Sequence, residues 1–188
     1  MNQTKSKEEY LMIREEIIHY YDIIQNLRNV LYVSLAAILT FAVSSKEPLL
    51  CLIPYCIIIP IYIVTIDYQY GIWRMGTYLL VFHEGEIFNW ETRLHNLNIS
   101  LNKRMNRHAS SYHWPFIITG ICCDILFFLK LNYKKIYYKS IAEIIFCVLI
   151  SIIFLVFVFI QKNPDQIKSL YIEQWKIIKE SGKCVTKK

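Results

Sequence analysis

Apolar residues along the chain are gathered into four long runs, and most charged residues lie in the segments between them. The runs cover residues 30–43, 49–66, 114–129 and 141–160. The second run contains no charged residue and would rise about 27 Å as a helix, close to the roughly 30 Å hydrocarbon thickness of a bilayer. A helix buried in a soluble bundle normally keeps one polar stripe, which the second and fourth runs lack. The pattern predicts an all-α polytopic membrane protein with four transmembrane helices and long cytoplasmic helical extensions.

Prolines and carboxylates interrupt these runs. Pro54 and Pro60 lie within the second run, where each removes a backbone hydrogen bond and is expected to kink the helix. Asp124 breaks the third run, and Glu143 lies near the start of the fourth. Only residues 44–48 separate the first two runs, which predicts a tight helical hairpin.

Composition and charge agree with a membrane protein and indicate its orientation. The chain of 188 residues is 55% hydrophobic and 19% charged, whereas a soluble domain is about 25% charged. Most of the 21 Lys and Arg residues lie in the N-terminal segment, in residues 67–113 and in the C-terminal tail. The positive-inside rule therefore places both termini in the cytoplasm, with the protein in the inner (cytoplasmic) membrane. The loop after the third run is more basic than this rule favours, with Lys130, Lys134, Lys135 and Lys139.

The N-terminal segment carries a heptad seam that leads directly into the first apolar run. The seam residues alternate at spacings of three and four and are Tyr10, Ile13, Ile17, Tyr20, Ile24, Leu27 and Leu31. This spacing predicts one continuous helix from about Ser6 to Val43. The seam is expected to pack either on another helix of the same chain or on its copy in a neighbouring subunit. Helical spacing continues after the second run to about Leu80, so a partner within the chain is expected there.

Two further amphipathic helices are expected outside the apolar runs. The first begins near Asn89, and its apolar stripe consists of Leu94, Leu97, Leu101 and Met105. This helix is expected to lie on anionic lipid headgroups or to pack on the other cytoplasmic helices. The second begins at Pro164, is stopped by Gly182, and presents on one face Ile167, Leu170, Tyr171, Gln174, Ile177 and Ile178.

These elements divide the chain into five consecutive parts. They are a cytoplasmic helix over 1–29 that continues into the first span, a transmembrane hairpin over 30–66, a cytoplasmic helical region over 67–113, a second transmembrane hairpin over 114–160, and a cytoplasmic helix with a basic tail over 161–188.

Asp124 is the acidic residue expected nearest the middle of a span. An uncompensated charge there costs several kcal/mol, so this carboxyl group must be neutral, paired, or turned to water or to the bundle interior. Its depth corresponds to that of Val148 and Ser151 in the fourth span, which makes Asp124 and Ser151 a candidate intramembrane polar site. Two interpretations remain open. Asp124 either lines a pore or responds to protons, or it is a protonated acid that bonds to a neighbouring helix.

Motifs for catalysis or for metal binding are missing from the sequence. His83 is followed by Glu84, but a second His four residues after His83 is absent, so the pattern is not that of a zinc-binding helix. Cys and His do not cluster at ligand spacing, and the sequence has neither a Gly-rich phosphate loop nor a G-x-S-x-G elbow. We therefore expect no enzymatic activity, no cofactor, no metal and no nucleic-acid partner.

One segment resembles known proteins. Residues 70–93 contain an aromatic-rich helix followed by V-F-x-E and W-E-x-R, formed here by Gly71, Gly76, Tyr78, Val81, Phe82, Glu84, Trp90, Glu91 and Arg93. This segment resembles a stretch of small, uncharacterised bacterial multi-pass membrane proteins. The architecture of the first half is also similar to SLATT-type effectors of bacterial conflict systems, which pair two spans with long cytoplasmic helices and are thought to form pores. This chain differs from the SLATT-type architecture because two further spans are predicted in its second half.

The sequence leaves two functional hypotheses. The first is a homo-oligomeric bacterial inner-membrane protein that acts as a channel-like or membrane-disrupting effector in phage defence. The alternative is a membrane anchor or scaffold, without a pore, for a cytoplasmic partner protein. Both hypotheses make the lipid bilayer a partner, and the first also requires self-association.

Overall fold

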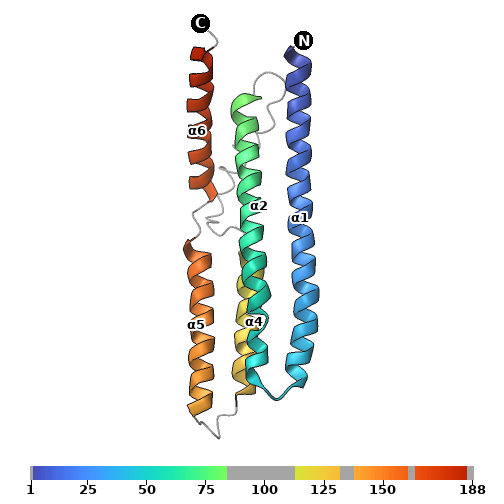
Figure 1. The fold of residues 1–188 in the computed structure, drawn as a ribbon, viewed down its shortest axis with the longest axis vertical. Coiled ribbons are helices and arrows are strands. Elements are labelled where there is room, and N and C mark those ends of the chain that lie inside the picture. The colour runs from blue at the N-terminus through green and yellow to red at the C-terminus, as the bar shows by residue number, and fades with distance from the viewer. Residues whose placement is uncertain (1, 84–112, 132–137, 161–163, 186–188) are drawn as a thin grey trace, which may run out of the picture. The chain divides into compact units, whose positions relative to one another are not determined.

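In the computed structural model of the protein, every regular element of the described residues is a helix. The structure describes residues 2–83, 113–131, 138–160 and 164–185. In chain order (Figure 1) the elements are α1 (Asn2–Ser44), the 3-10 helix η1 (Pro48–Leu52), α2 (Tyr55–Phe82), α4 (Trp114–Lys130), α5 (Tyr138–Ile160) and α6 (Pro164–Val185). The predicted all-α class is therefore confirmed for these residues.

Three helical stretches are long and apolar enough to cross a membrane. They are Ser6–Ser44, Pro48–Phe82 and Ile141–Ile160, with mean hydropathies of 1.6, 2.5 and 3.1 in their most apolar windows. The third apolar run of the sequence forms α4, which is helical but has only 17 residues. Membrane-compatible helices are thus found in three of the four expected places.

The long first helix agrees with the heptad pattern of the sequence. It runs without interruption for 43 residues, a little beyond both expected ends. In its C-terminal part the hydroxyl of Thr40 donates to the carbonyl of Ala36 at 2.7 Å. Such a bond satisfies a polar side chain inside the helix's own backbone, which keeps this apolar stretch compatible with lipid.

The second apolar run is not a single helix, so the expected kink at Pro54 is wrong. The run begins with η1, which has Pro48 in its first turn, and α2 starts only after Pro54. The backbone amides of Ile57 and Ile58 both donate to the Pro54 carbonyl at 2.9 Å. A proline that precedes a helix sacrifices no helical hydrogen bond, because the first amides of a helix have no partner within it. Pro60 does lie inside α2, as expected.

The structure separates into two compact units, and α1 and α2 contribute to both. Unit 1 comprises Met1–Ile24, Asp67–Ser110 and Lys162–Lys188, and unit 2 comprises Gln25–Ile66 and Ser111–Gln161. In the described residues, unit 1 therefore contains the first half of α1, the second half of α2, and α6. Unit 2 contains the remaining parts of α1 and α2 together with η1, α4 and α5.

The core of unit 1 is formed by the heptad seam and α2 of the same chain. Ile17 and Ile24 are buried in one cluster with Ile72 and Leu79 of α2. Half-buried residues of both helices complete this cluster, namely Tyr10, Ile13, Tyr20, Tyr68, Met75 and Tyr78. The seam therefore has a packing partner within the chain. Its continuation in unit 2 is half-buried at Leu27 and buried at Leu31.

The third helix of unit 1, α6, differs from its prediction in length and in part of its buried face. It continues past Gly182 to Val185, so the expected stop at this glycine is wrong. Three residues of the predicted apolar face are exposed, with exposed fractions of 46% for Leu170, 60% for Ile177 and 50% for Ile178. Ile167 of the same face is buried, with an exposed fraction of 8%, and Tyr171 is half-buried. Trp175, which was not part of the predicted face, also contacts α2, with its ring 5.3 Å from that of Tyr78. The predicted face is therefore correct at Ile167 and Tyr171 and wrong at Leu170, Ile177 and Ile178.

Aromatic side chains dominate the core of unit 2. Tyr55, Tyr62, Phe116 and Phe127 are among the largest fully buried side chains. Tyr62 meets Phe116 edge to face at 5.2 Å, and Tyr55 meets Phe154 in the same way at 5.7 Å. These aromatic contacts pack α2 against both α4 and α5.

Some predictions concern residues that the structure does not describe. The amphipathic stripe of Leu94, Leu97, Leu101 and Met105 lies outside the described residues, as do Glu84, Trp90, Glu91 and Arg93 of the resembling segment.

Candidate functional site

The structure brings Asp124 and Ser151 together inside unit 2. The Ser151 hydroxyl of α5 lies 3.0 Å and 2.9 Å from the two carboxyl oxygens of Asp124 on α4. The Tyr55 hydroxyl, from the first turn of α2, lies 3.0 Å from Asp124 Oδ1. The Cys147 thiol of α5 is 3.7 Å from the same oxygen. Two helices, α2 and α5, thus contribute polar groups to a carboxyl group of the third, α4.

A glycine on α4 makes room for the tyrosine of this site. Gly120 lies one helical turn before Asp124, and a Cβ at Gly120 would lie 3.2 Å from both the Tyr55 hydroxyl and Phe154 Cε1. Without that Cβ, the Tyr55 hydroxyl approaches to 3.1 Å of the Gly120 carbonyl. Tyr55 was not predicted from the sequence as part of this site. The available signal was a tyrosine directly after Pro54 in a run that is otherwise almost entirely aliphatic.

The hydroxyl groups that bind Asp124 also have backbone acceptors. Tyr55 and Ser151 have one hydroxyl proton each, and each also lies near a backbone carbonyl, that of Gly120 at 3.1 Å and that of Cys147 at 2.9 Å. Each hydroxyl proton is therefore within reach of both the carboxyl group and a carbonyl.

In unit 2, a lysine at the end of α4 binds the end of α1. Lys130, the last residue of α4, donates from its ammonium to the carbonyls of Ala42, Val43 and Ser45 at the end of α1, with distances of 2.8 Å to Val43 and 2.5 Å to Ser45. The last carbonyls of a helix have no partner within it, and the negative end of the helix dipole favours a cation. An ammonium has three donor protons, so this arrangement matches donors to acceptors.

A second polar pair of unit 2 lies where α4 begins. The Tyr62 hydroxyl is 2.8 Å from Nδ1 of His113, the residue before α4. Burial lowers the pKa of His113 below its ordinary value, because the charged imidazolium loses hydration there. In the neutral imidazole, the Tyr62 hydroxyl donates to Nδ1 when the ring proton is on Nε2, and Nδ1–H donates to the hydroxyl oxygen in the other tautomer.

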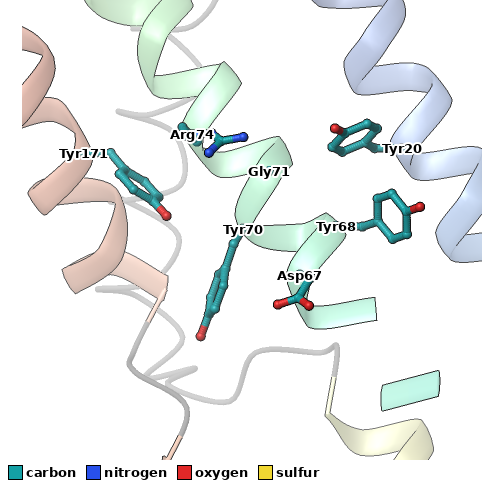
Figure 2. A pocket seen from close by; sticks show the side chains of 7 residues that line it. All are labelled: Tyr20, Asp67, Tyr68, Tyr70, Gly71, Arg74 and Tyr171. Carbon is teal, nitrogen blue, oxygen red and sulfur yellow. The ribbon is translucent and has the colours of Figure 1, made fainter. Parts of the chain in front are cut away.

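Unit 1 contains a groove on the face of α2 that begins where the second apolar run ends. It has a volume of about 280 Å³ and is lined by Tyr20, Asp67, Tyr68, Tyr70, Gly71, Arg74 and Tyr171. Figure 2 shows Tyr20 and Tyr68 on the side of α1, and Tyr70 and Tyr171 on the side of α6. Tyr20 and Tyr171 come from segments far from α2 in the sequence, so no local pattern connects them to the other residues of the groove.

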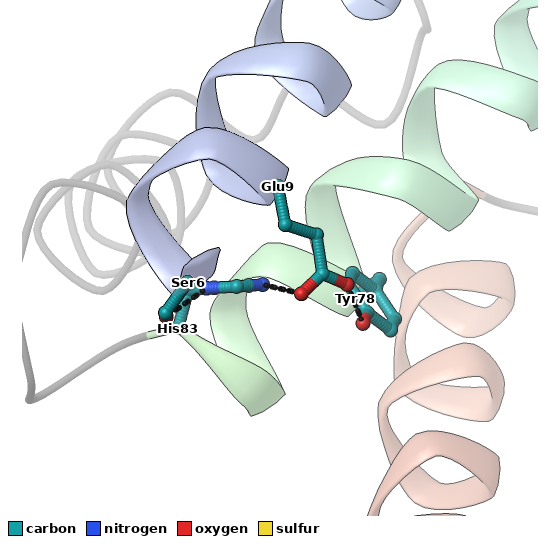
Figure 3. A network of polar contacts seen from close by, with 4 residues as sticks. All are labelled: Ser6, Glu9, Tyr78 and His83. Atoms are coloured by element: carbon teal, nitrogen blue, oxygen red, sulfur yellow. Dashed lines mark hydrogen bonds and ion pairs between the residues drawn. The ribbon is translucent and has the colours of Figure 1, made fainter. Parts of the chain in front are cut away.

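A polar network in unit 1 fastens α1 to the end of α2 (Figure 3). The Tyr78 hydroxyl donates to Glu9 Oε1 at 2.5 Å, and Nε2 of the buried His83 is 3.7 Å from Glu9 Oε2. The Ser6 hydroxyl lies 3.2 Å from Nδ1 of His83. Burial, and then the neighbouring Glu9 carboxylate, raise the pKa of Tyr78 to about 12, so its phenol stays a donor at neutral pH. These residues are too far apart in sequence for any spacing to predict the network.

No protein-family model, curated protein or solved structure matches this chain. The class of protein is therefore defined by its architecture. The described residues form an all-helical chain in which three helices are long and apolar enough to span a membrane.

Proposed function

We propose that the chain is an inner-membrane protein with four spans, whose copies associate to let ions or protons cross the bilayer. Loss of the membrane potential on such passage is the effect expected of an effector in phage defence. The proposal assigns the cytoplasmic side to both termini and to the extramembrane parts of α1, α2 and α6. It requires no cofactor.

The length and composition of α4 support a fourth span. Its 17 residues contain one charged group before the terminal Lys130, and 17 residues is the lower end of the range that spans a bilayer. Lys130 binds the end of α1, so its charge is not free in the loop that follows. This reduces the conflict between that basic loop and the positive-inside rule.

The observation that carries the proposal is the position of Asp124. It lies in an apolar helix, and hydroxyls of two other helices bind its carboxyl group. Ionisable groups inside a membrane commonly mark ion or proton paths. One copy of four helices encloses too little volume for a path of its own, so passage requires association. Ile118, Ile121 and Ile125 of α4 are exposed and supply an apolar face for lipid or for another copy.

A second candidate function is a membrane anchor or scaffold for a cytoplasmic partner protein. The observation in its favour is that the carboxyl oxygens of Asp124 already have partners within the chain. A group held in this way also serves simply to join α2, α4 and α5.

The two candidates differ in what induced expression does to bacterial cells. The channel-like protein should collapse the membrane potential, as measured with a potential-sensitive dye, and Asp124→Asn should change that effect at equal membrane levels. A constant potential, together with a soluble protein that co-purifies with the chain, would contradict passage and support the scaffold.

A further inference from the structure

Two polar sites of unit 2 follow one another along the same face of α2. Tyr55 and Tyr62 are seven residues apart, so they share that face and lie about 10 Å apart along the helix axis. The Tyr55 hydroxyl bonds to Asp124 inside α4, and the Tyr62 hydroxyl bonds to His113 just before α4 begins. We call the first pair the carboxyl site and the second pair the imidazole site. Each site thus joins a tyrosine hydroxyl to a titratable side chain.

An apolar ring lies between the carboxyl site and the imidazole site. Phe154 of α5 is buried, with an exposed fraction of 2%. The centre of its ring lies 5.7 Å from that of Tyr55 and 6.1 Å from that of Tyr62. Gly120 of α4 leaves room for this ring, because a Cβ there would lie 3.2 Å from Phe154 Cε1. Phe154 therefore contacts the tyrosine of each site from the interior of the unit.

The groups of the two sites are suited to protons. A hydroxyl can accept a proton at its oxygen while it releases its own, so a tyrosine relays a proton without a net change of charge. Carboxyl and imidazole groups hold and release protons, and chains of such groups inside membrane proteins form proton relays. A potassium ion instead needs a ring of oxygen atoms to replace its hydration shell. The pair of Tyr62 and His113 supplies one hydroxyl oxygen and one imidazole.

We propose that the passing ion is the proton and that Phe154 is the barrier between the carboxyl site and the imidazole site. Protons move between the sites when the Phe154 side chain turns aside and water takes its place, because an apolar constriction blocks passage by excluding water. Asp124 is half-buried, so contact with another copy completes the route beyond the carboxyl site. This inference rests on the passage of ions or protons proposed above and names both the ion and the residue that limits its passage.

Flux through the full-length protein in liposomes tests the proposal. Proton uptake is driven by a potassium gradient with valinomycin, and passage of potassium itself is followed without valinomycin by a potassium-sensitive dye. The wild type should pass protons and exclude potassium. Phe154→Ala leaves a cavity between polar groups that water can fill. This variant should pass protons several-fold faster than the wild type and still exclude potassium.

Two variants separate loss of the barrier from loss of packing. Phe154→Leu keeps an apolar side chain between the sites and should pass protons at the wild-type rate. Phe127→Ala removes another fully buried ring of unit 2, which packs edge to face on Phe128, and should also pass protons at the wild-type rate. Equal gains in Phe127→Ala and Phe154→Ala would show loosened packing and would overturn the barrier.

The imidazole of His113 tests the barrier without a measurement of flux. Burial lowers its pKa, and water admitted by Phe154→Ala should move that pKa back toward its ordinary value. NMR titration of the full chain with labelled histidine in detergent measures the pKa, with the signal assigned by its loss in His113→Gln. Phe127→Ala should leave the pKa of His113 as it is in the wild type.

The possible failures are distinguishable. An unchanged proton flux in Phe154→Ala would overturn the barrier, and passage of potassium by the wild type would overturn the assignment to protons. If neither ion passes through any of these proteins, the function proposed above is wrong. The titration of His113 then decides the role of Phe154 alone, and an unchanged pKa in Phe154→Ala would contradict that role.

Discussion

Two glycines of α2 have opposite surroundings. A Cβ at Gly71 would meet the Tyr20 ring at 2.6 Å, whereas a Cβ at Gly76 meets no described atom within 4 Å. Gly71→Ala should therefore lower the free energy of unfolding by about 1–3 kcal/mol, the usual cost of overpacking. Gly76→Ala should raise it by up to about 1 kcal/mol, because alanine is the better helix former. Thermal unfolding followed by circular dichroism in one detergent measures both, and a shift in the same direction would contradict the close packing at Gly71.

His113 should make the protein less stable in acid. Its pKa is lowered by burial, so the folded chain binds a proton at this imidazole less readily than the unfolded chain does. The stability it contributes is complete above the ordinary value of about 6.5 and is lost as the pH falls toward the folded pKa. His113→Gln should show a smaller fall in unfolding temperature than the wild type between about pH 7.5 and 5.5. An equal fall in unfolding temperature for the variant and the wild type would show that His113 does not contribute to the loss of stability in acid.

Residue-level features of the site were only partly predictable. The depth of Asp124 in its run was sufficient to select Ser151 as a neighbour, because helix rise alone sets depth. Tyr55 was not selected, because its place depends on the start of α2 after Pro54 and on the space above Gly120. Packing of this kind depends on side chains from distant segments.

At the scale of the elements, Lys130 joins the end of α4 to the end of α1. Lys130→Met should lower the free energy of unfolding by about 1–3 kcal/mol, because two carbonyls of α1 and that of Ser45 just after it lose a charged donor. Lys46→Gln, which changes an exposed lysine of the neighbouring hairpin, should remain within about 0.5 kcal/mol of the wild type. Equal effects of the two substitutions would contradict the role of Lys130 as a cap.

The helices themselves were largely predictable from periodicity, and their interruptions were not. Long apolar or heptad patterns predicted α1, α4 and α5 to within a few residues. Pro54 and Gly182 were misassigned because each residue type has two uses. A proline breaks a helix in its interior but is tolerated at its start, and a glycine can end a helix or only weaken it. Tertiary contacts decide between these uses.

At the scale of the whole molecule, the proposed topology predicts which residues are reached from each side of the membrane. In a chain whose other cysteines are replaced by alanine, Cys184 should react with an impermeant maleimide only after the cells are permeabilised. A cysteine introduced by Lys135→Cys, at a position between α4 and α5 in the sequence, should react in intact cells. Labelling of Cys184 from outside would contradict the orientation, and failure to label position 135 from outside would contradict the four spans.

The central claim is that associated copies let ions or protons cross the membrane under the influence of Asp124. The direct measurement uses liposomes that contain the purified full-length protein. A potassium gradient is imposed, and a pH-sensitive dye inside the liposomes reports the flux of protons. The proposal predicts that the wild type dissipates the gradient faster than protein-free liposomes, and that Asp124→Asn, incorporated at the same level, changes that rate. Flux at the level of protein-free liposomes for both proteins would contradict the claim.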